Sequence, residues 1–369
     1  DNGSVIDIMV VYTAEARAGA GGKAAMEALI DSFIAYTNQS YRNSGVAQRL
    51  NLVHSHEVRY AQSASLSLDL DRLTNVDGAM DEVHTLRNAY GADLVTLIVD
   101  GITSSCGVAW QLQDTIFAAN NAFSVMVDDC GGRVFAHELG HTMGANHDRH
   151  VTQEPGYADY SHGYVSRAGG WATIMAYFDE CMDNNLSCRG LPYWSNPDIK
   201  FEGIAMGVRA GKAGSADNRK TLNETAFYVA NHRQRPAAEP RTLAVTTGGA
   251  GRGRVTSSPV GINCGSVCAL PFANGGTVTL TATPLPGYSF AGWSGACSGM
   301  GSCTITMNQN RAVSASFAAG TTADLLLVDD DNNSPNVRHY YADALEALGM
   351  SFDVWDTVSS DVEPDLALL

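Results

Sequence analysis

One short segment, residues 135–148, constrains this chain more than any other part of it. It reads Phe-Ala-His-Glu-Leu-Gly-His-Thr-Met-Gly-Ala-Asn-His-Asp. If the segment begins as a helix, His137 and His141 lie four residues apart on one face, where two imidazoles can reach one ion. Gly144 can adopt a positive φ and turn the chain, so that His147 approaches the same ion from another direction. Three histidines that leave a fourth position open form the ligand set of a catalytic zinc ion.

Glu138 lies next to the two-histidine face in a helix over residues 133 to about 144. Its carboxylate can therefore accept a proton from an attacking water molecule without being a metal ligand, which predicts a general base. The alternative is that H-E-x-x-H occurs by chance and that the histidines are ordinary satisfied polar residues. The glycine and the third histidine, both at the required spacing, favour the metal site.

The spacing H-E-x-x-H-x-x-G-x-x-H resembles the metzincin clan of zinc endopeptidases, and Asp148 after the third histidine is similar to the adamalysin/reprolysin branch. Residues 173–177, Thr-Ile-Met-Ala-Tyr, look like the Met-turn of that clan, which places a methionine, here Met175, beneath the histidines. Gly144, Asp148 and Met175 are accordingly expected to support the site. Segments 192–197 and 216–225 resemble secreted bacterial reprolysin-like peptidases.

The resemblance covers roughly residues 4–235 and implies an α/β (α+β) catalytic domain over 1–235, with a mixed five-stranded sheet and a zinc helix. It also implies a zymogen whose removed pro-segment covered the zinc. The chain begins at Asp1 without an initiator methionine, so a processed form is expected.

Tyr177 stands two residues after Met175, as in the astacin and serralysin branches. There such a tyrosine ligates zinc or stabilises the oxyanion, and the resemblance extends this role to Tyr177. The alternative is a tyrosine packed in the turn, with its hydroxyl bonded to the backbone.

Substrate contacts are expected on both sides of the metal. The family places its edge strand at residues 107–110, where an exposed edge can pair with an extended peptide. Residues 192–197 are expected to form the pocket wall for the residue after the scissile bond. A related family of bacterial peptidases cuts before aspartate, which requires a basic pocket residue that the sequence alone does not place. The expected contact residues are Gly107, Val108, Ala109, Trp110, Tyr193 and Trp194.

Eight cysteines form an even set with no C-x-x-C zinc pair, so disulfides in an oxidising compartment are predicted. Buried free thiols are the alternative for any one of them. Cys106 with Cys130 would brace the segment before the zinc helix, and Cys181 with Cys188 would close a short loop. The remaining four are Cys264, Cys268, Cys297 and Cys303.

The net charge of −16 argues against nucleic-acid and anionic-membrane partners, and no apolar run is long enough for a membrane span. A secreted, extracellular monomer is expected. An acidic surface can also bind Ca²⁺, with Asp128-Asp129 and Asp217-Asn218 as candidate ligands. Solvated acidic loops explain the same residues more simply.

Hydrophobic periodicity predicts strands over 5–12, 50–60 and 93–99 and helices over 14–43 and 69–90. Two prolines then mark a linker over 236–241. Residues 242–318 are rich in Gly, Ser, Thr and Val, which predicts a small disulfide-stapled antiparallel sheet domain similar to bacterial repeat modules. Residues 319–369 predict the beginning of an α/β unit, which is either the incomplete start of a longer region or a small appendage.

Together these features predict a secreted zinc endopeptidase acting on polypeptides, with Zn²⁺ held by His137, His141 and His147 and with Glu138 as general base. One alternative is a cell-wall peptide amidase or hydrolase. Another is an adhesin-type binding protein with protease activity attached.

Overall fold

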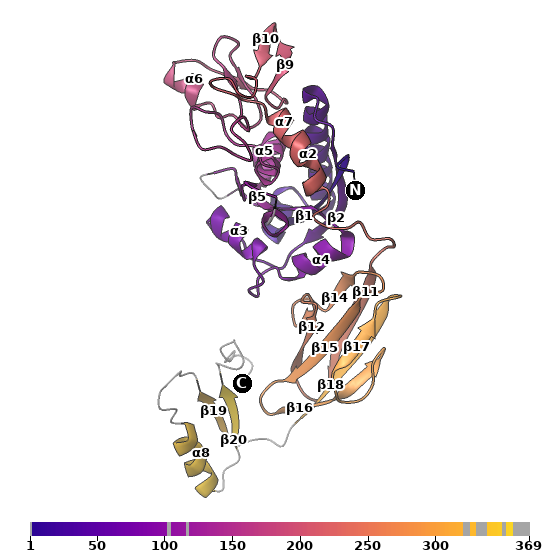
Figure 1. Ribbon diagram of the computed structural model, residues 1–369. Coiled ribbons are helices and arrows are strands. Elements are labelled where there is room, and N and C mark those ends of the chain that lie inside the picture. The colour runs from indigo at the N-terminus through magenta and orange to yellow at the C-terminus, as the bar shows by residue number, and fades with distance from the viewer. Residues whose placement is uncertain are drawn as a thin grey trace. The chain divides into compact units, whose positions relative to one another are not determined.

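The computed structural model describes residues 2–101, 105–115, 118–319, 325–329, 338–348 and 352–356. Two compact units, Asp1–Pro240 and Arg241–Leu369, divide the chain (Figure 1). No helix in the described part is both long enough and apolar enough to cross a membrane.

A mixed five-stranded sheet forms the centre of the first unit, with the strand order β2-β1-β3-β5-β4. Four strands run parallel, whereas β4 pairs antiparallel with β5 at the edge of the sheet. The predicted mixed sheet is therefore confirmed. Its strands are β1 (Val5–Tyr12), β2 (Arg49–Glu57), β3 (Leu94–Val99), β4 (Gly107–Ala109) and β5 (Phe123–Val127).

Helices cover both faces of this sheet, with α2 and α5 on one side and α3 and α4 on the other (Figure 1). On the first side, Phe33 of α2 and Phe135 of α5 are buried with ring centroids 5.6 Å apart. Burying a side chain of this size contributes about 1.5–3 kcal/mol, so this contact fixes α5 over the sheet. The helices are α1 (Ala14–Gly19), α2 (Lys23–Ser44), α3 (Leu66–Thr74), α4 (Glu82–Tyr90) and α5 (Gly131–Thr142), with short 3₁₀ helices η1 (Ala118–Asn121) and η2 (Asp128–Cys130).

The two long helices predicted over 14–43 and 69–90 are wrong in extent, because each is two helices. Gly21 and Gly22 separate α1 from α2 with φ values of 93° and 114°. Between α3 and α4, Gly78 and Met80 also have positive φ, at 95° and 57°. A right-handed helix cannot continue through residues with positive φ.

After α5 the chain forms short elements around the histidine-bearing turn. They are β6 (Val165–Ser166), β7 (Trp171–Ala172), α6 (Asp179–Asp183), β8 (Arg189–Gly190), β9 (Asn196–Phe201), β10 (Ile204–Met206) and α7 (Asn218–Val229). Asp217 caps α7 by accepting a hydrogen bond from the Lys220 amide at 3.0 Å. This capping occupies one carboxylate that the sequence offered as a calcium ligand.

Two four-stranded sheets make up residues 241–319, in the orders β14-β11-β18-β16 and β13-β12-β15-β17. The expectation of a purely antiparallel domain is wrong at one pair, because β11 and β18 run parallel. Two parallel strands cannot be joined by a tight hairpin. Here the two strands are the first and last of the module, and all the other strands of the module lie between them in the sequence. The strands are β11 (Arg241–Gly249), β12 (Gly253–Ser258), β13 (Asn263–Cys264), β14 (Ala269–Phe272), β15 (Thr277–Pro284), β16 (Tyr288–Gly295), β17 (Cys303–Thr306) and β18 (Arg311–Ala319).

The last described elements are β19 (Leu325–Asp329), α8 (Arg338–Ala347) and β20 (Phe352–Asp356). Strands β19 and β20 pair in parallel, as a strand–helix–strand unit requires.

Candidate metal centre

Three histidine side chains converge at the C-terminal end of α5. His137 and His141 come from the helix, and Gly144, with a φ of 94°, turns the chain so that His147 joins them. Nε2 of His147 lies 3.0 Å from Nε2 of His141 and 3.1 Å from Nε2 of His137. Zinc–nitrogen bonds of about 2.0–2.1 Å at a tetrahedral angle place ligand atoms about 3.3–3.4 Å apart. The three residues therefore fit a zinc ion, and within the described ranges they are the one group of three or more His, Cys, Asp or Glu side chains arranged to share an ion.

Hydrogen bonds to the other ring nitrogens orient two of these imidazoles. Nδ1 of His137 donates to the carbonyl of Ile174 at 2.9 Å, and Nδ1 of His141 lies 2.8 Å from Oε1 of Gln111. A proton held on Nδ1 leaves the lone pair of Nε2 free for a metal. Burial lowers the pKa of His137 well below its usual value and that of His141 to about 3, so both rings are neutral. Sequence reasoning missed Gln111, because its position relative to His141 depends on the tertiary fold.

Met175 packs directly against the zinc helix. A Cβ added to Gly140 would lie 2.5 Å from Sδ of Met175 and 2.8 Å from the ring of Trp194. Glycine at this position therefore allows the turn to approach the helix. The turn itself is closed by a hydrogen bond from the Ala176 amide to the carbonyl of Thr173, at 3.1 Å.

Glu138 lies beneath the edge strand β4. Its side chain is only 5% exposed, and burial raises the pKa of the carboxyl to about 8. A Cβ added to Gly107 would lie 2.5 Å from Oε1 of Glu138, so the strand backbone rests on the carboxylate. Only the absence of a side chain at residue 107 permits this contact.

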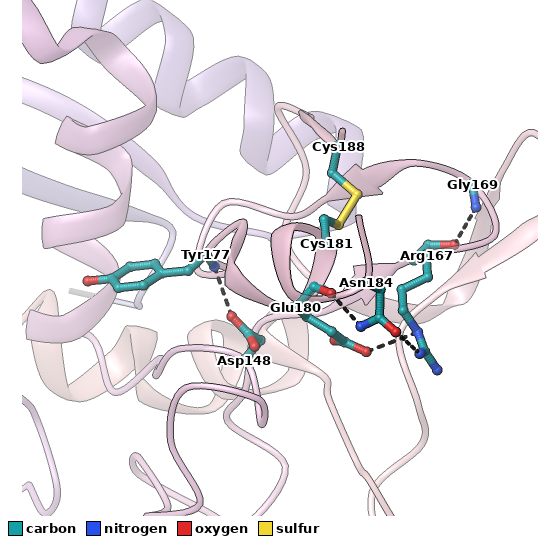
Figure 2. Close-up of a disulfide and its surroundings, with 9 residues drawn as sticks. Asp148, Arg167, Gly169, Tyr177, Glu180, Cys181, Asn184 and Cys188 are labelled. Carbon is teal, nitrogen blue, oxygen red and sulfur yellow. Dashed lines mark hydrogen bonds and ion pairs between the residues drawn. A yellow bond between two sulfur atoms is a disulfide. The ribbon is translucent and has the colours of Figure 1, made fainter. Parts of the chain in front are cut away.

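Tyr177 and Asp148 link the turn of residues 173–177 to the third histidine. One carboxylate oxygen of Asp148 accepts the Tyr177 amide at 2.8 Å, and the other accepts the His150 amide at 3.0 Å. The Tyr177 ring is 43% exposed, and its centroid lies 4.4 Å from that of His147. Figure 2 shows this phenol extending away from the Cys181–Cys188 loop with no dashed line at its hydroxyl. The ring is thus placed beside the metal ligands.

The residues expected to contact substrate lie in two places, at the sheet edge around β4 and in the segment of Tyr193 and Trp194. Strand β4 is the sheet edge, and Trp110, just beyond it, donates its indole N–H to Thr74 at 2.8 Å. Tyr193 is half-buried, with its ring centroid 5.9 Å from that of Phe201. Trp194 is fully buried and donates its indole N–H to Ser40 at 2.9 Å. Its ring therefore has no exposed surface to offer a substrate, contrary to the expectation of a direct contact.

All eight cysteines are paired, which confirms the predicted disulfides. Cys106–Cys130 and Cys181–Cys188 are the two pairs named from the sequence. The other two bonds, Cys264–Cys268 and Cys297–Cys303, close loops within the second unit.

A three-histidine centre at the end of a helix, beside a buried glutamate, is the arrangement of a metal-dependent hydrolase. Residues 2–187 match the family described as Metallo-peptidase family M12, and the chain belongs to that family. Residues 243–321 match the divergent InlB B-repeat domain.

Several similar proteins carry the name peptidyl-Asp metalloendopeptidase. The one from Stenotrophomonas maltophilia (strain R551-3) is 38% identical over 238 residues, which are 62% of this chain and 53% of that protein. The one from Pseudomonas fragi is 32% identical over 167 residues, 45% of this chain and 85% of that protein. The chain thus spans about half the length of the Stenotrophomonas relative.

Among solved structures, a chain in "Structure of a chaperone-substrate complex" has a TM-score of 0.50 and 20% identity, covering 63% of this chain and 40% of that chain. This likeness concerns the fold alone.

Proposed function

We propose that this chain is a zinc endopeptidase that hydrolyses internal peptide bonds of polypeptides. The observation that carries the proposal is the convergence of three histidines in a member of a metallopeptidase family, with Nε2 of His147 at 3.0 Å from that of His141 and 3.1 Å from that of His137. The catalytic domain is residues 1–235, of metzincin type, joined through 236–241 to the β-module of residues 242–318. Strands β19 and β20 with helix α8 belong to a further α/β segment.

Zinc bound by His137, His141 and His147 would polarise the scissile carbonyl and lower the pKa of a water molecule. Glu138 accepts the proton of the attacking water and delivers it to the leaving amine. The hydroxyl of Tyr177 donates a hydrogen bond to the developing oxyanion. Met175, Gly144 and Asp148 hold these groups in place.

Substrate lies along β4 as an added strand, so that backbone hydrogen bonds hold it independently of its side chains. Gly107 to Trp110 supply this edge, and Tyr193, backed by Trp194, forms part of the opposite wall. The name of the relatives extends the proposal to polypeptides cut at aspartate residues.

Four disulfides support an oxidising, extracellular location for the protein. A monomer is proposed because one chain supplies all three histidines. Activation from a zymogen rests on the family resemblance, and calcium binding remains a secondary proposal at Asp128-Asp129.

The test replaces Glu138 by alanine and measures bound zinc and cleavage of casein, with and without a zinc chelator. Glu138→Ala should keep the zinc and lose turnover by about 10²–10⁴-fold, because only the proton acceptor is removed. Glu57→Gln, which removes an exposed carboxylate on β2, should cleave casein like the unaltered chain. Full activity in Glu138→Ala contradicts the mechanism. Cleavage of cell-wall peptides but not casein would favour an amidase.

A further inference from the structure

Arg133 lies one helical turn before His137, on the same face of α5. Residues four apart on a helix are neighbours, so the Arg133 side chain starts beside the first metal ligand. Its Nη2 donates to the carbonyls of Thr173 and Ala176, at 2.9 Å and 2.6 Å. Its Cζ lies 5.1 Å from the ring centroid of Phe178. The guanidinium is thus held between the zinc helix and the Met-turn.

The charge of Arg133 is not compensated by any carboxylate in the described ranges. Both acceptors of Nη2 are neutral carbonyls, and Nε is buried without a hydrogen-bond partner. Burial lowers the pKa of this guanidinium, as expected where a cation lacks a counter-ion. Arginine has five N–H donors in a planar fork, and most of those on Arg133 remain unused.

Other basic side chains near the site differ from Arg133 in this respect. A neighbouring cavity of about 610 Å³ is lined by Arg149, His150 and Arg167 among others. These pair with Asp159, Asp183 and Glu180 at 3.1 Å, 2.8 Å and 3.3 Å, respectively. Figure 2 shows the pair of Arg167 with Glu180. These three basic side chains therefore have carboxylate partners within the chain.

Strand β8 makes room for the guanidinium. A Cβ added to Gly190 would lie 2.7 Å from Nε and 3.0 Å from Cδ of Arg133. Gly190 pairs with Ala172 of β7, and the preceding loop is closed by the Cys181–Cys188 disulfide. Strand β8 is thus fixed against this arginine.

We propose that Arg133 is the residue that selects an acidic side chain in the substrate, by binding the carboxylate of the residue that follows the scissile bond. This inference rests on the proposed endopeptidase function. A local cation is needed for such a preference, because the net charge of −16 repels acidic peptides. A planar guanidinium with free donors matches a carboxylate in shape and charge.

The test compares two peptides that differ only in having Asp or Asn after the cleaved bond, using the full chain loaded with zinc. The ratio of the two kcat/KM values is the readout, because a partly unfolded variant lowers both values equally. Arg133→Met should reduce the Asp-over-Asn ratio by about 10–100-fold, and Arg133→Lys should retain part of it. Arg167→Met, which removes an already paired cation, is the control and should leave the ratio unchanged.

An unchanged ratio in Arg133→Met, or zinc-dependent cleavage with no preference for Asp in the unaltered chain, overturns this inference alone. Absence of cleavage of every peptide by the zinc-loaded chain overturns the proposed function and this inference with it.

Discussion

The unit of residues 1–240 buries many polar and charged side chains, whereas every buried side chain described in residues 241–319 is apolar or a disulfide cysteine. In the first unit Asp7, Arg87 and Glu138 are buried. In the second, Leu280 and Phe317 are typical of the interior. Burying a polar group costs free energy unless it is paired, so such groups persist where chemistry or specificity requires them. The comparison assigns the chemistry to the first unit and apolar packing to the β-module.

Metal removal should produce the largest difference between the two units, because only the first unit contains the histidine centre. His147→Ala removes one ligand, so the variant should lose its zinc and its casein cleavage. Chelation of the unaltered chain should lower the unfolding free energy of the first unit by about 3–4 kcal/mol, for zinc at 100–1,000 times its Kd. Calorimetry should show that the β-module transition does not move. Equal shifts of both transitions would show that the units do not unfold independently.

A cavity in the β-module should destabilise that module and leave the first unit and its activity unchanged. Phe317 is 1% exposed, and its ring centroid lies 5.6 Å from that of Phe290. Phe317→Ala should destabilise the module by about 3–5 kcal/mol. The rate of casein cleavage should not change, because the metal centre lies in the other unit. The matched control is Thr281→Ala, at an exposed position of β15, which should shift the transition by less than about 0.5 kcal/mol. Loss of cleavage in Phe317→Ala would contradict the assignment of chemistry to the first unit.

A smaller loss of stability should follow when the ion pair between Arg235 and Asp7 in the first unit is broken. Arg235 donates to both carboxylate oxygens of Asp7, at 2.8 Å and 2.7 Å. The Asp7 side chain is only 5% exposed, while that of Arg235 is 54% exposed. Arg235→Ala leaves a buried carboxylate short of partners and should cost about 1.5–3 kcal/mol of unfolding free energy, measured by urea denaturation.

Arg72→Gln provides the comparison for that measurement, because its ion pair with Asp77 is largely solvent-exposed. Such pairs contribute about 0–1 kcal/mol. Equal losses of unfolding free energy in Arg235→Ala and Arg72→Gln would mean that burial of Asp7 does not strengthen its ion pair with Arg235.

The sequence was sufficient to predict features that depend on the type and spacing of residues close together in the chain. Helix α5, the turn at Gly144 and the disulfide-bonded state of the cysteines follow from spacing and residue type, whereas the cysteine connectivity stayed open. The strand over 5–12 matches β1, since a run of apolar residues buried on both faces has few alternatives. The breaks at Gly21-Gly22 and near Gly78 were not predicted, because a helical periodicity can continue across residues whose backbone leaves the helix.

The residues that sequence reasoning did not find act through tertiary contacts. Gln111 reaches His141 from a separate segment, and no spacing rule connects them. Arg133 differs, since its position four residues before His137 was visible in the chain. What was not visible is that no carboxylate meets it, and this absence among the described residues is what distinguishes it from Arg149, His150 and Arg167.

The Cys106–Cys130 bond joins the residue before β4 to the residue before α5. Its two ends therefore belong to the strand proposed to hold the peptide backbone and to the helix that carries two metal ligands. Thermal motion can displace this strand and helix together, but the covalent bond restricts how far they separate. At this point the alignment of the bound peptide with the metal thus depends on a covalent bond as well as on packing. Reduction of the disulfide would let β4 occupy a wider range of positions relative to α5, while all three metal ligands stayed unchanged.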